Sequence, residues 1–335
     1  MKETSIPATS FFRSALLVAI ALLPMGAMAF DLSSDSSRVV SDPSYLPLGA
    51  QLFGSTEYSY NQTTSNTENY QGAQLFSNKT TTTTIIQVLE YGVTDDFSLR
   101  VSGYYQLQGA TNNYSSGANT VTTSYGVGDP TFAAIWRVLD QKTQPLNCDL
   151  IGAYTADLIN AESASSGQFG TVARGGAMAV LGMALSHKTK GFTVYVEGSA
   201  TYLDSRDVLN QTNGFTTNFD SSWQYAVYFT TQTRFTDQFS LNAGVSQTFT
   251  DSQNASFTNA NGKLIDYTNQ AGDPTVLTVA LNYQVTLGGF VASLIYTHDF
   301  YANGGNDFSK FPKSDTTTSD KSANLFGAEV RYVFD

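Results

Sequence analysis

The sequence has few of the side chains from which most enzymatic and metal sites are built. It contains one cysteine, Cys148, and only two histidines, His187 and His298, among 335 residues. One cysteine excludes an intramolecular disulfide framework, and these three residues lie too far apart in the sequence for metal-ligand spacing. No glycine-rich phosphate-binding motif is present. The sequence therefore predicts no metal site and no cofactor.

A catalytic nucleophile is also missing from the sequence pattern. A hydrolase embedded in a membrane needs a base beside an activated serine or water, and no local serine motif marks one. His298 precedes Asp299, but adjacent residues of a strand point to opposite faces and cannot act together. We therefore expect that the protein is not an enzyme.

Charged residues are scarce. Asp, Glu, Lys and Arg make up 13% of the chain, which is about half of the usual fraction. Polarity is carried instead by the uncharged hydroxyls and amides of Tyr, Thr, Ser, Asn and Gln. The formal net charge is −11, and an acidic balance argues against a nucleic-acid partner.

Long hydrophobic runs are limited to the N-terminus. Lys2 and Arg13 accompany the apolar run 15–23, and Ala27-Met28-Ala29 offers a small-residue cleavage site. We expect residues 1–29 to be a cleaved secretory signal peptide, and its removal leaves a formal net charge of −12. After it, no apolar segment approaches the roughly 18 residues that a membrane helix requires. A helical membrane protein is therefore excluded.

The remaining chain alternates between strand-like segments and turns. Residues 30–48 show no sustained period and are predicted to form an irregular periplasmic lead-in or a plug. Residues 49–335 contain twelve segments with two-residue periodicity. The predicted strands are 50–60, 82–91, 97–108, 125–139, 146–156, 175–187, 192–203, 222–235, 239–250, 274–284, 290–300 and 322–334.

The lengths of these segments and of their connections are typical of a membrane barrel. A tilted strand of about ten residues rises about 25 Å, which matches the apolar band of an outer-membrane barrel. Short turns alternate with longer loops, such as 61–81, 109–124, 204–221, 251–273 and 301–321. The sequence therefore predicts an all-β, transmembrane antiparallel up-and-down β-barrel of about 12 strands in a bacterial outer membrane, in contact with its lipid.

The faces of the strands follow from the cost of placing charge against lipid. Arg or Lys facing lipid at mid-bilayer costs about 2–4 kcal/mol, so the charged side of each strand should face the lumen. In strand 97–108 this rule directs Leu99, Val101 and Tyr105 outward and Arg100 inward. The segment 82–91 is apolar on both faces, and its register stays open.

The last strand carries a further signal. Phe326, Ala328, Val330, Tyr332 and Phe334 share one face of the two-residue period. An amphipathic terminal strand with a near-terminal Phe resembles the signal by which outer-membrane barrels are recognised for insertion. We therefore expect the barrel-insertion machinery to be a partner through this strand.

The candidate site residues are the polar and aromatic side chains predicted to face the lumen. They are either a charged constriction that selects solutes or a set of ion pairs that fills the barrel base, as Arg137 with Asp149 across one hairpin. The constriction candidates are Arg100, Arg137, Asp149, Glu197, Arg234, Glu329 and Arg331, and the lumenal aromatic candidates are Tyr104, Tyr195 and Tyr228.

Three stretches carry a resemblance to a known family. They are Leu89 to Leu99 (L-E-Y-G-V-T-D-D-F-S-L), Tyr125 to Thr131 (Y-G-V-G-D-P-T) and Ala134 to Leu139 (A-I-W-R-V-L). Together they are similar to the family named for the MetA pathway of phenol degradation, in which an E-Y-G-x-T-D turn and a G-x-G-D strand opening recur. The resemblance implies an outer-membrane channel for phenol-like or other hydrophobic compounds.

The function expected from these observations is passive uptake of small, aromatic or hydrophobic solutes through an outer-membrane channel. The alternative is a surface interaction or adhesion protein that uses its extracellular loops, with a plugged barrel as its anchor. The sequence leaves open which solute passes, whether residues 30–48 close the lumen, and the oligomeric state.

Overall fold

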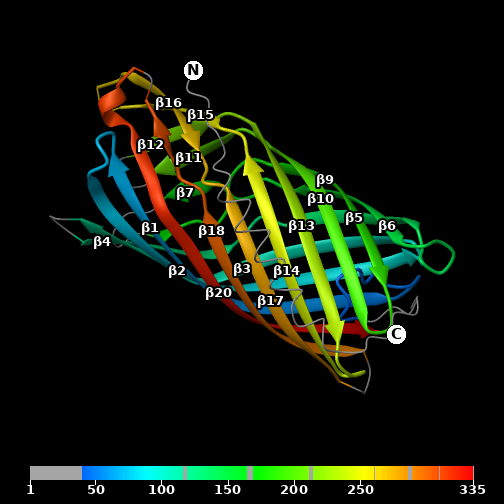
Figure 1. Cartoon of the computed structure of the whole chain (residues 1–335). Coiled ribbons are helices and arrows are strands. Elements are labelled where there is room, and N and C mark those ends of the chain that lie inside the picture. Colours follow the sequence, from blue (N-terminus) through cyan, green and yellow to red (C-terminus); the bar gives the residue numbers. More distant parts are fainter. Residues whose placement is uncertain are drawn as a thin grey trace.

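The computed structural model describes residues 40–115, 119–163, 169–210, 214–259, 261–285, 289–308 and 310–334. Within these residues, twelve antiparallel strands form a closed barrel (Figure 1). Closure is made by the first and last strands, which pair over most of their length, with Tyr58 opposite Ala328. The predicted fold class and strand number are confirmed. In order around the barrel, the strands are β1 (Leu52–Asn69), β2 (Gln74–Thr94), β3 (Phe97–Ser115), β5 (Thr131–Leu139), β6 (Asn147–Thr155), β9 (Met178–Lys188), β10 (Phe192–Leu203), β13 (Ser222–Arg234), β14 (Phe239–Thr250), β17 (Pro274–Val285), β18 (Phe290–Tyr301) and β20 (Thr316–Phe334).

Shorter strands extend the wall at the end opposite the C-terminus (Figure 1). Several are hairpins within the predicted longer loops 204–221 and 251–273, and β1 and β2 extend into the predicted loop 61–81. These segments are rich in Thr, which strands favour, and strand pairing satisfies their backbone groups. The extensions are β4 (Asn119–Val127), β7 (Ala161–Ser163), β8 (Phe169–Gly170), β11 (Arg206–Asn210), β12 (Phe215–Phe219), β15 (Gln253–Thr258), β16 (Leu264–Gln270) and β19 (Gly304–Asp307). The 3-10 turn η2 (Pro312–Ser314) precedes β20.

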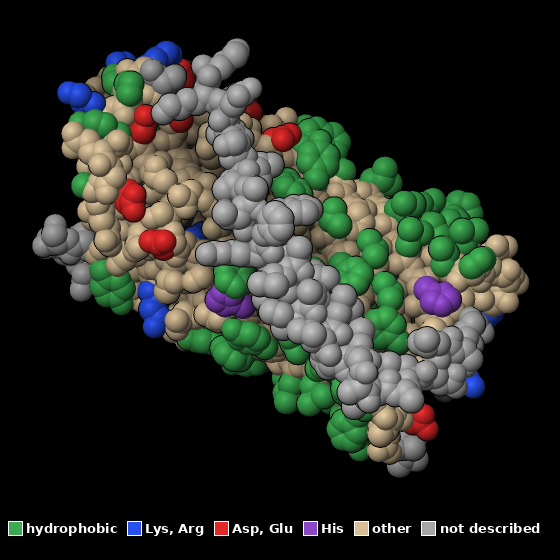
Figure 2. All heavy atoms as spheres, in the orientation of Figure 1, with side chains coloured by type: hydrophobic (Ala, Val, Ile, Leu, Met, Phe, Trp, Pro, Cys, Tyr) green, Lys and Arg blue, Asp and Glu red, His purple; other side chains and the backbone are tan. Residues whose placement is uncertain are grey.

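The strand faces follow the predicted alternation. On β3, Leu99, Val101 and Tyr105 are exposed on the outer surface, while Arg100 is half-buried. On β2, the open register is settled by Glu90, which is 2% exposed, between the exposed Leu89 and Tyr91. Figure 2 shows hydrophobic side chains spread over the wall, with charged side chains gathered at the end where β15 and β16 lie. The wall therefore presents an apolar surface to lipid.

No helix in the described part of the chain is long and apolar enough to cross a membrane.

The N-terminal segment, residues 40–48, enters the base of the barrel. Val40 packs with Phe53 of β1 and Val291 of β18, and Leu46 is only 1% exposed. The C-terminal end of this segment lies against Gly92 of β2, where an added Cβ would be 2.0 Å from the Leu48 carbonyl oxygen. Glycine is therefore required in the E-Y-G turn because the lead-in backbone approaches too closely for any side chain.

Candidate functional site

The base of the lumen is built from ion pairs between neighbouring strands. Arg137 of β5 binds Asp149 of β6 through two contacts, Nε–Oδ1 at 2.7 Å and Nη2–Oδ2 at 2.9 Å. Both side chains are less than a tenth exposed. The pairing predicted across this hairpin is confirmed, and its two-pronged geometry neutralises the arginine charge.

A second pair lies on β2 and β3. Arg100 Nε and Nη2 lie 2.8 and 2.7 Å from Glu90 Oε2, and Ser98 donates its hydroxyl to Oε1 of the same carboxylate at 2.5 Å. Glu90 is not among the predicted site residues, because its strand has two apolar faces. Its position directly opposite Arg100 across a hairpin was the signal that identifies it.

The third pair lies on the C-terminal strand. Arg331 Nε binds Glu329 Oε2 at 2.9 Å, and Arg331 Nη1 donates to the Val40 carbonyl at 3.3 Å. The strand therefore contacts the N-terminal segment through one of its predicted lumenal side chains.

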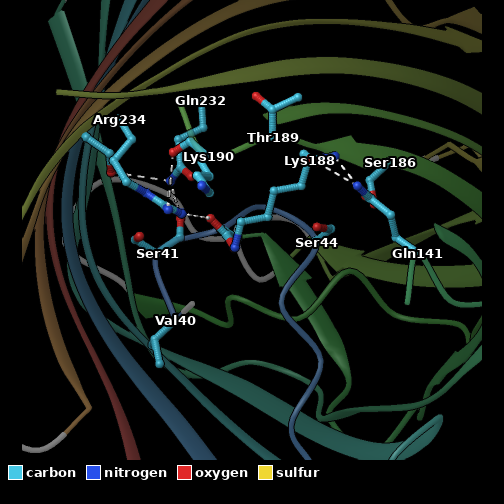
Figure 3. A network of polar contacts seen from close by, with 12 residues as sticks. Val40, Ser41, Ser44, Gln141, Ser186, Lys188, Thr189, Lys190, Gln232 and Arg234 are labelled. Carbon is cyan, nitrogen blue, oxygen red and sulfur yellow. Dashed lines mark hydrogen bonds and ion pairs between the residues drawn. The ribbon is translucent and has the colours of Figure 1, made fainter. Parts of the chain in front are cut away.

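The N-terminal segment carries the acid that partners the remaining cations. Asp42 Oδ2 lies 2.6 Å from Lys188 Nζ, and Asp42 Oδ1 lies 3.2 Å from Arg234 Nη2. Gln232 Nε2 donates to the Ser41 carbonyl at 2.7 Å. Figure 3 shows Lys188, Gln232 and Arg234 reaching from the wall toward the segment that carries Ser41.

The segment is thus held by side chains from several parts of the wall. Besides these contacts, Arg137 Nη2 donates to the Ser44 carbonyl at 2.8 Å. Residues 40–48 therefore lie in the base of the lumen, while the first part of the predicted lead-in, residues 30–39, lies outside the described residues, as does the predicted signal peptide. Lys188 was not among the predicted site residues, because its carboxylate partner is 146 residues away.

Higher in the lumen, two of the three predicted aromatic residues gather around a carboxylate. The Tyr195 hydroxyl donates to Glu197 Oε2, and Glu197 faces Tyr228 across the pairing of β10 with β13. Tyr228 faces inward by the strand alternation, yet it is 39% exposed. The lumen is therefore open beside its ring.

Tyr104 has a different role. Its hydroxyl donates to the Val172 carbonyl at 2.7 Å, which ties the connection between β8 and β9 to the lumenal side of β3. Of the predicted aromatic group, the structure brings Tyr195 and Tyr228 together and leaves Tyr104 on this separate contact.

The histidines and the cysteine take structural positions. His187 Nδ1 lies 2.7 Å from the Pro145 carbonyl, and His298 Nδ1 lies 2.7 Å from Asn324 Oδ1. Cys148 is buried on β6. Over the described ranges, no three His, Cys, Asp or Glu side chains are grouped in a way that could hold a metal ion.

Comparisons with known proteins support the fold. No family model and no curated sequence matches the chain, so the resemblance to the phenol-degradation family stays a prediction. The crystal structure of the COG4313 outer membrane channel from Pseudomonas putida F1 is similar with a TM-score of 0.53 and 17% identity, over 88% of this chain and 99% of that one. The transport unit of the autotransporter AIDA-I from Escherichia coli gives 0.51 and 10% identity, over 88% and 93%.

A mutant of the monoaromatic hydrocarbon channel TodX is more distant, with a TM-score of 0.44 and 12% identity, over 92% of this chain and 97% of that one. This likeness is too weak to carry an argument. The closed twelve-stranded barrel and its likeness to known outer-membrane barrels place the protein in the bacterial outer membrane.

Proposed function

We propose that the protein is a passive outer-membrane channel for small solutes with an aromatic or otherwise apolar body. The observation that carries the proposal is the half-open lumenal face at Tyr228, beside Glu197 and Tyr195. An aromatic ring offers a stacking surface, and the carboxylate accepts a hydrogen bond from a solute hydroxyl. The likeness to a barrel described as a channel supports the same function.

The four arginines at the base favour a filled base over a free cationic filter. Each is paired with a carboxylate of the wall or of the N-terminal segment. A paired guanidinium attracts passing anions weakly. The nearby carboxylate cancels most of its field at distances larger than the separation of the two charges. Selection would then come from the shape and the aromatic lining above the base.

The first experiment measures single-channel conductance of refolded protein in a planar bilayer, with and without phenol. We expect a steady conductance that phenol interrupts. Tyr228→Leu should shorten the phenol-induced interruptions several-fold. Tyr225→Leu is the matched control, since Tyr225 lies on the same strand but faces outward. Equal effects of the two substitutions would refute a lumenal site at Tyr228.

A surface interaction protein is the second candidate. It is favoured by the hairpin extensions β11–β12 and β15–β16, which raise polar side chains above the wall. A barrel that inserts correctly but stays silent, both with and without residues 30–48, would move the assignment to these extensions.

We also propose that the protein is not an enzyme and that β20 is the strand recognised by the barrel-insertion machinery. For β20, the support is its outward row of Phe326, Val330 and Phe334. Replacing Phe334 by Ser should lower the yield of inserted barrel in membranes without preventing its refolding in detergent. An unchanged yield in membranes would refute the recognition of this residue.

A further inference from the structure

Two arginines lie together at the extracellular end of the barrel. Arg174 belongs to the connection between β8 and β9, and Arg206 is the first residue of β11. Arg206 Nη1 donates to the carbonyl oxygen of Arg174 at 3.0 Å. The backbones are also close, because a Cβ added to Gly176 would lie 3.2 Å from the Arg206 Cβ. The two half-buried guanidinium groups are therefore held near one another by the fold.

Neither guanidinium has an anionic partner in the described part of the chain. The shortest contact of Arg174 is a hydrogen bond from Nη1 to the Gly175 carbonyl at 3.0 Å, with contacts of 3.4 to 3.5 Å to the Gly176 and Asp204 carbonyls. The Nε of Arg206 is buried and has no acceptor. A buried donor without a partner is costly, and native structures leave few of them.

The pKa values of both arginines are lowered, which agrees with two half-buried positive charges lying close together. Burial and the nearby Arg206 guanidinium lower the pKa of Arg174 to about 10, although the Asp204 and Asp157 carboxylates act in the opposite direction. Burial also lowers the pKa of Arg206. An arginine side chain stays protonated at neutral pH, so the site holds two positive charges, neither of which forms an ion pair within the described residues.

Aromatic rings lie directly beside these charges. The Arg206 guanidinium carbon lies 4.6 Å from the centre of the Phe219 ring. Arg206 of β11 pairs with Phe219 of β12, Phe219 pairs with Ala255 of β15, and Ala255 pairs with Tyr267 of β16. These four residues therefore lie side by side on one face. Tyr267 stacks on Phe308 with ring centres 4.9 Å apart. Cationic donors and an apolar aromatic surface thus share one face of the extension.

We infer that Arg174 and Arg206 form a binding site for the carboxylate of a small aromatic acid, whose ring packs beside Phe219 and Tyr267. A carboxylate oxygen accepts hydrogen bonds from guanidinium N–H groups in the plane of the group, and it would supply the acceptor that Arg206 Nε lacks. The ring would add an apolar contact that a small inorganic anion cannot make. This inference rests on the proposed channel function and names a class of solute for its outer end.

The test is benzoate binding to the folded barrel in detergent, followed by isothermal titration calorimetry. We expect saturable binding that Arg174→Gln and Arg206→Gln each weaken about tenfold or more, which is the scale of one lost charge-assisted contact. Arg206→Lys, which keeps the charge and is the safer variant for folding, should retain part of the affinity. Folding of each variant is checked by its heat-modifiable gel mobility.

Lys310→Gln is the matched control. Lys310 is an extracellular cation whose side chain is 67% exposed and paired with Asp266, so its loss changes the net charge equally but removes neither guanidinium. Equal weakening by Arg206→Gln and Lys310→Gln would overturn the site. Acetate and benzyl alcohol test the two halves of the ligand, and either one binding as tightly as benzoate would overturn the aromatic-acid assignment.

The inference and the proposed channel fail separately. A barrel that conducts and is interrupted by phenol, but does not bind benzoate, retains the channel function and loses this site. A barrel that binds benzoate through the two arginines but never conducts retains the site and loses the channel function.

Discussion

Replacing Asp42 by Asn should release the N-terminal segment from the base of the lumen. The Asp42 carboxylate is 3% exposed and lies between Lys188 Nζ at 2.6 Å and Arg234 Nη2 at 3.2 Å. Asn keeps the size of the side chain but removes its charge. Lys188, only 4% exposed, then loses the carboxylate that Asp42 supplies. Removing one partner of a buried ion pair costs about 3–5 kcal/mol.

This cost falls on docking of the segment more than on the barrel, because the strand ladder does not depend on Asp42. Undocking exposes Lys188 to water, but it breaks the hydrogen bonds that the Ser41 and Ser44 carbonyls accept from Gln232 and Arg137. A loss of about 3 kcal/mol multiplies the ratio of undocked to docked segment by about 150. The substitution should therefore raise the mean conductance of the channel.

Accessibility of Ser41 measures the same equilibrium directly. Ser41 is 4% exposed, so in a Cys148→Ser background Ser41→Cys should react slowly with a maleimide. Asp42→Asn should speed this reaction by a factor close to the shift in docking. Asp266→Asn is the control, since its ion pair with Lys310 is exposed and such pairs contribute at most about 1 kcal/mol. Unchanged labelling and conductance in Asp42→Asn would refute the reasoning.

Two further predictions concern stability. Arg137→Met should lower the free energy of unfolding by about 3–5 kcal/mol, because Asp149 stays buried without its partner. The double mutant Arg137→Met with Asp149→Leu should recover most of this loss. Urea unfolding in detergent measures both free energies, and additive effects of the two substitutions would contradict the pairing. Gly92→Ala should lower the refolding yield, because the added Cβ would lie 2.0 Å from the Leu48 carbonyl oxygen. Gly103→Ala is the control, since a Cβ there meets nothing within 4 Å. The yields are measured by heat-modifiable gel mobility, and equal yields of the two variants would count against the close approach.

The barrel could be predicted because lipid imposes a local rule on its strands. Most outward residues are apolar whatever their distant neighbours are, so alternation along β3 assigns Leu99 and Arg100 to their faces without tertiary information. The rule fails on β2, where both faces are apolar. There the register depends on Glu90 meeting Arg100 and on Gln87, which bonds Thr56 on β1. Those contacts lie between strands and leave no local period.

The candidate site was predicted less completely, for a related reason. Lumenal side chains are selected by what lies across the barrel, and the partner can be far away in sequence. Arg137 and Asp149 share a hairpin, so their pairing was foreseeable. Lys188 and Asp42 are 146 residues apart, and the segment that carries Asp42 has no periodicity to announce where it docks. Arg174 and Arg206 meet through a connection whose path only the fold defines.

The order of charges from the extracellular end to the base of the barrel separates binding of a solute from its passage. The outer arginines, Arg174 and Arg206, have no carboxylate partner within the described residues, whereas those at the base are paired. Two further carboxylates face the lumen between these groups. Glu57 of β1 lies opposite Glu329 of β20, Glu197 accepts from Tyr195, and neither Glu57 nor Glu197 forms an ion pair within the described residues. An aromatic acid held at the outer end therefore meets repulsion on its way inward, while a neutral phenol does not. Tight benzoate binding with little benzoate flux is thus consistent with a channel that phenol crosses, because the outer site and the mid-lumen carboxylates favour opposite charges.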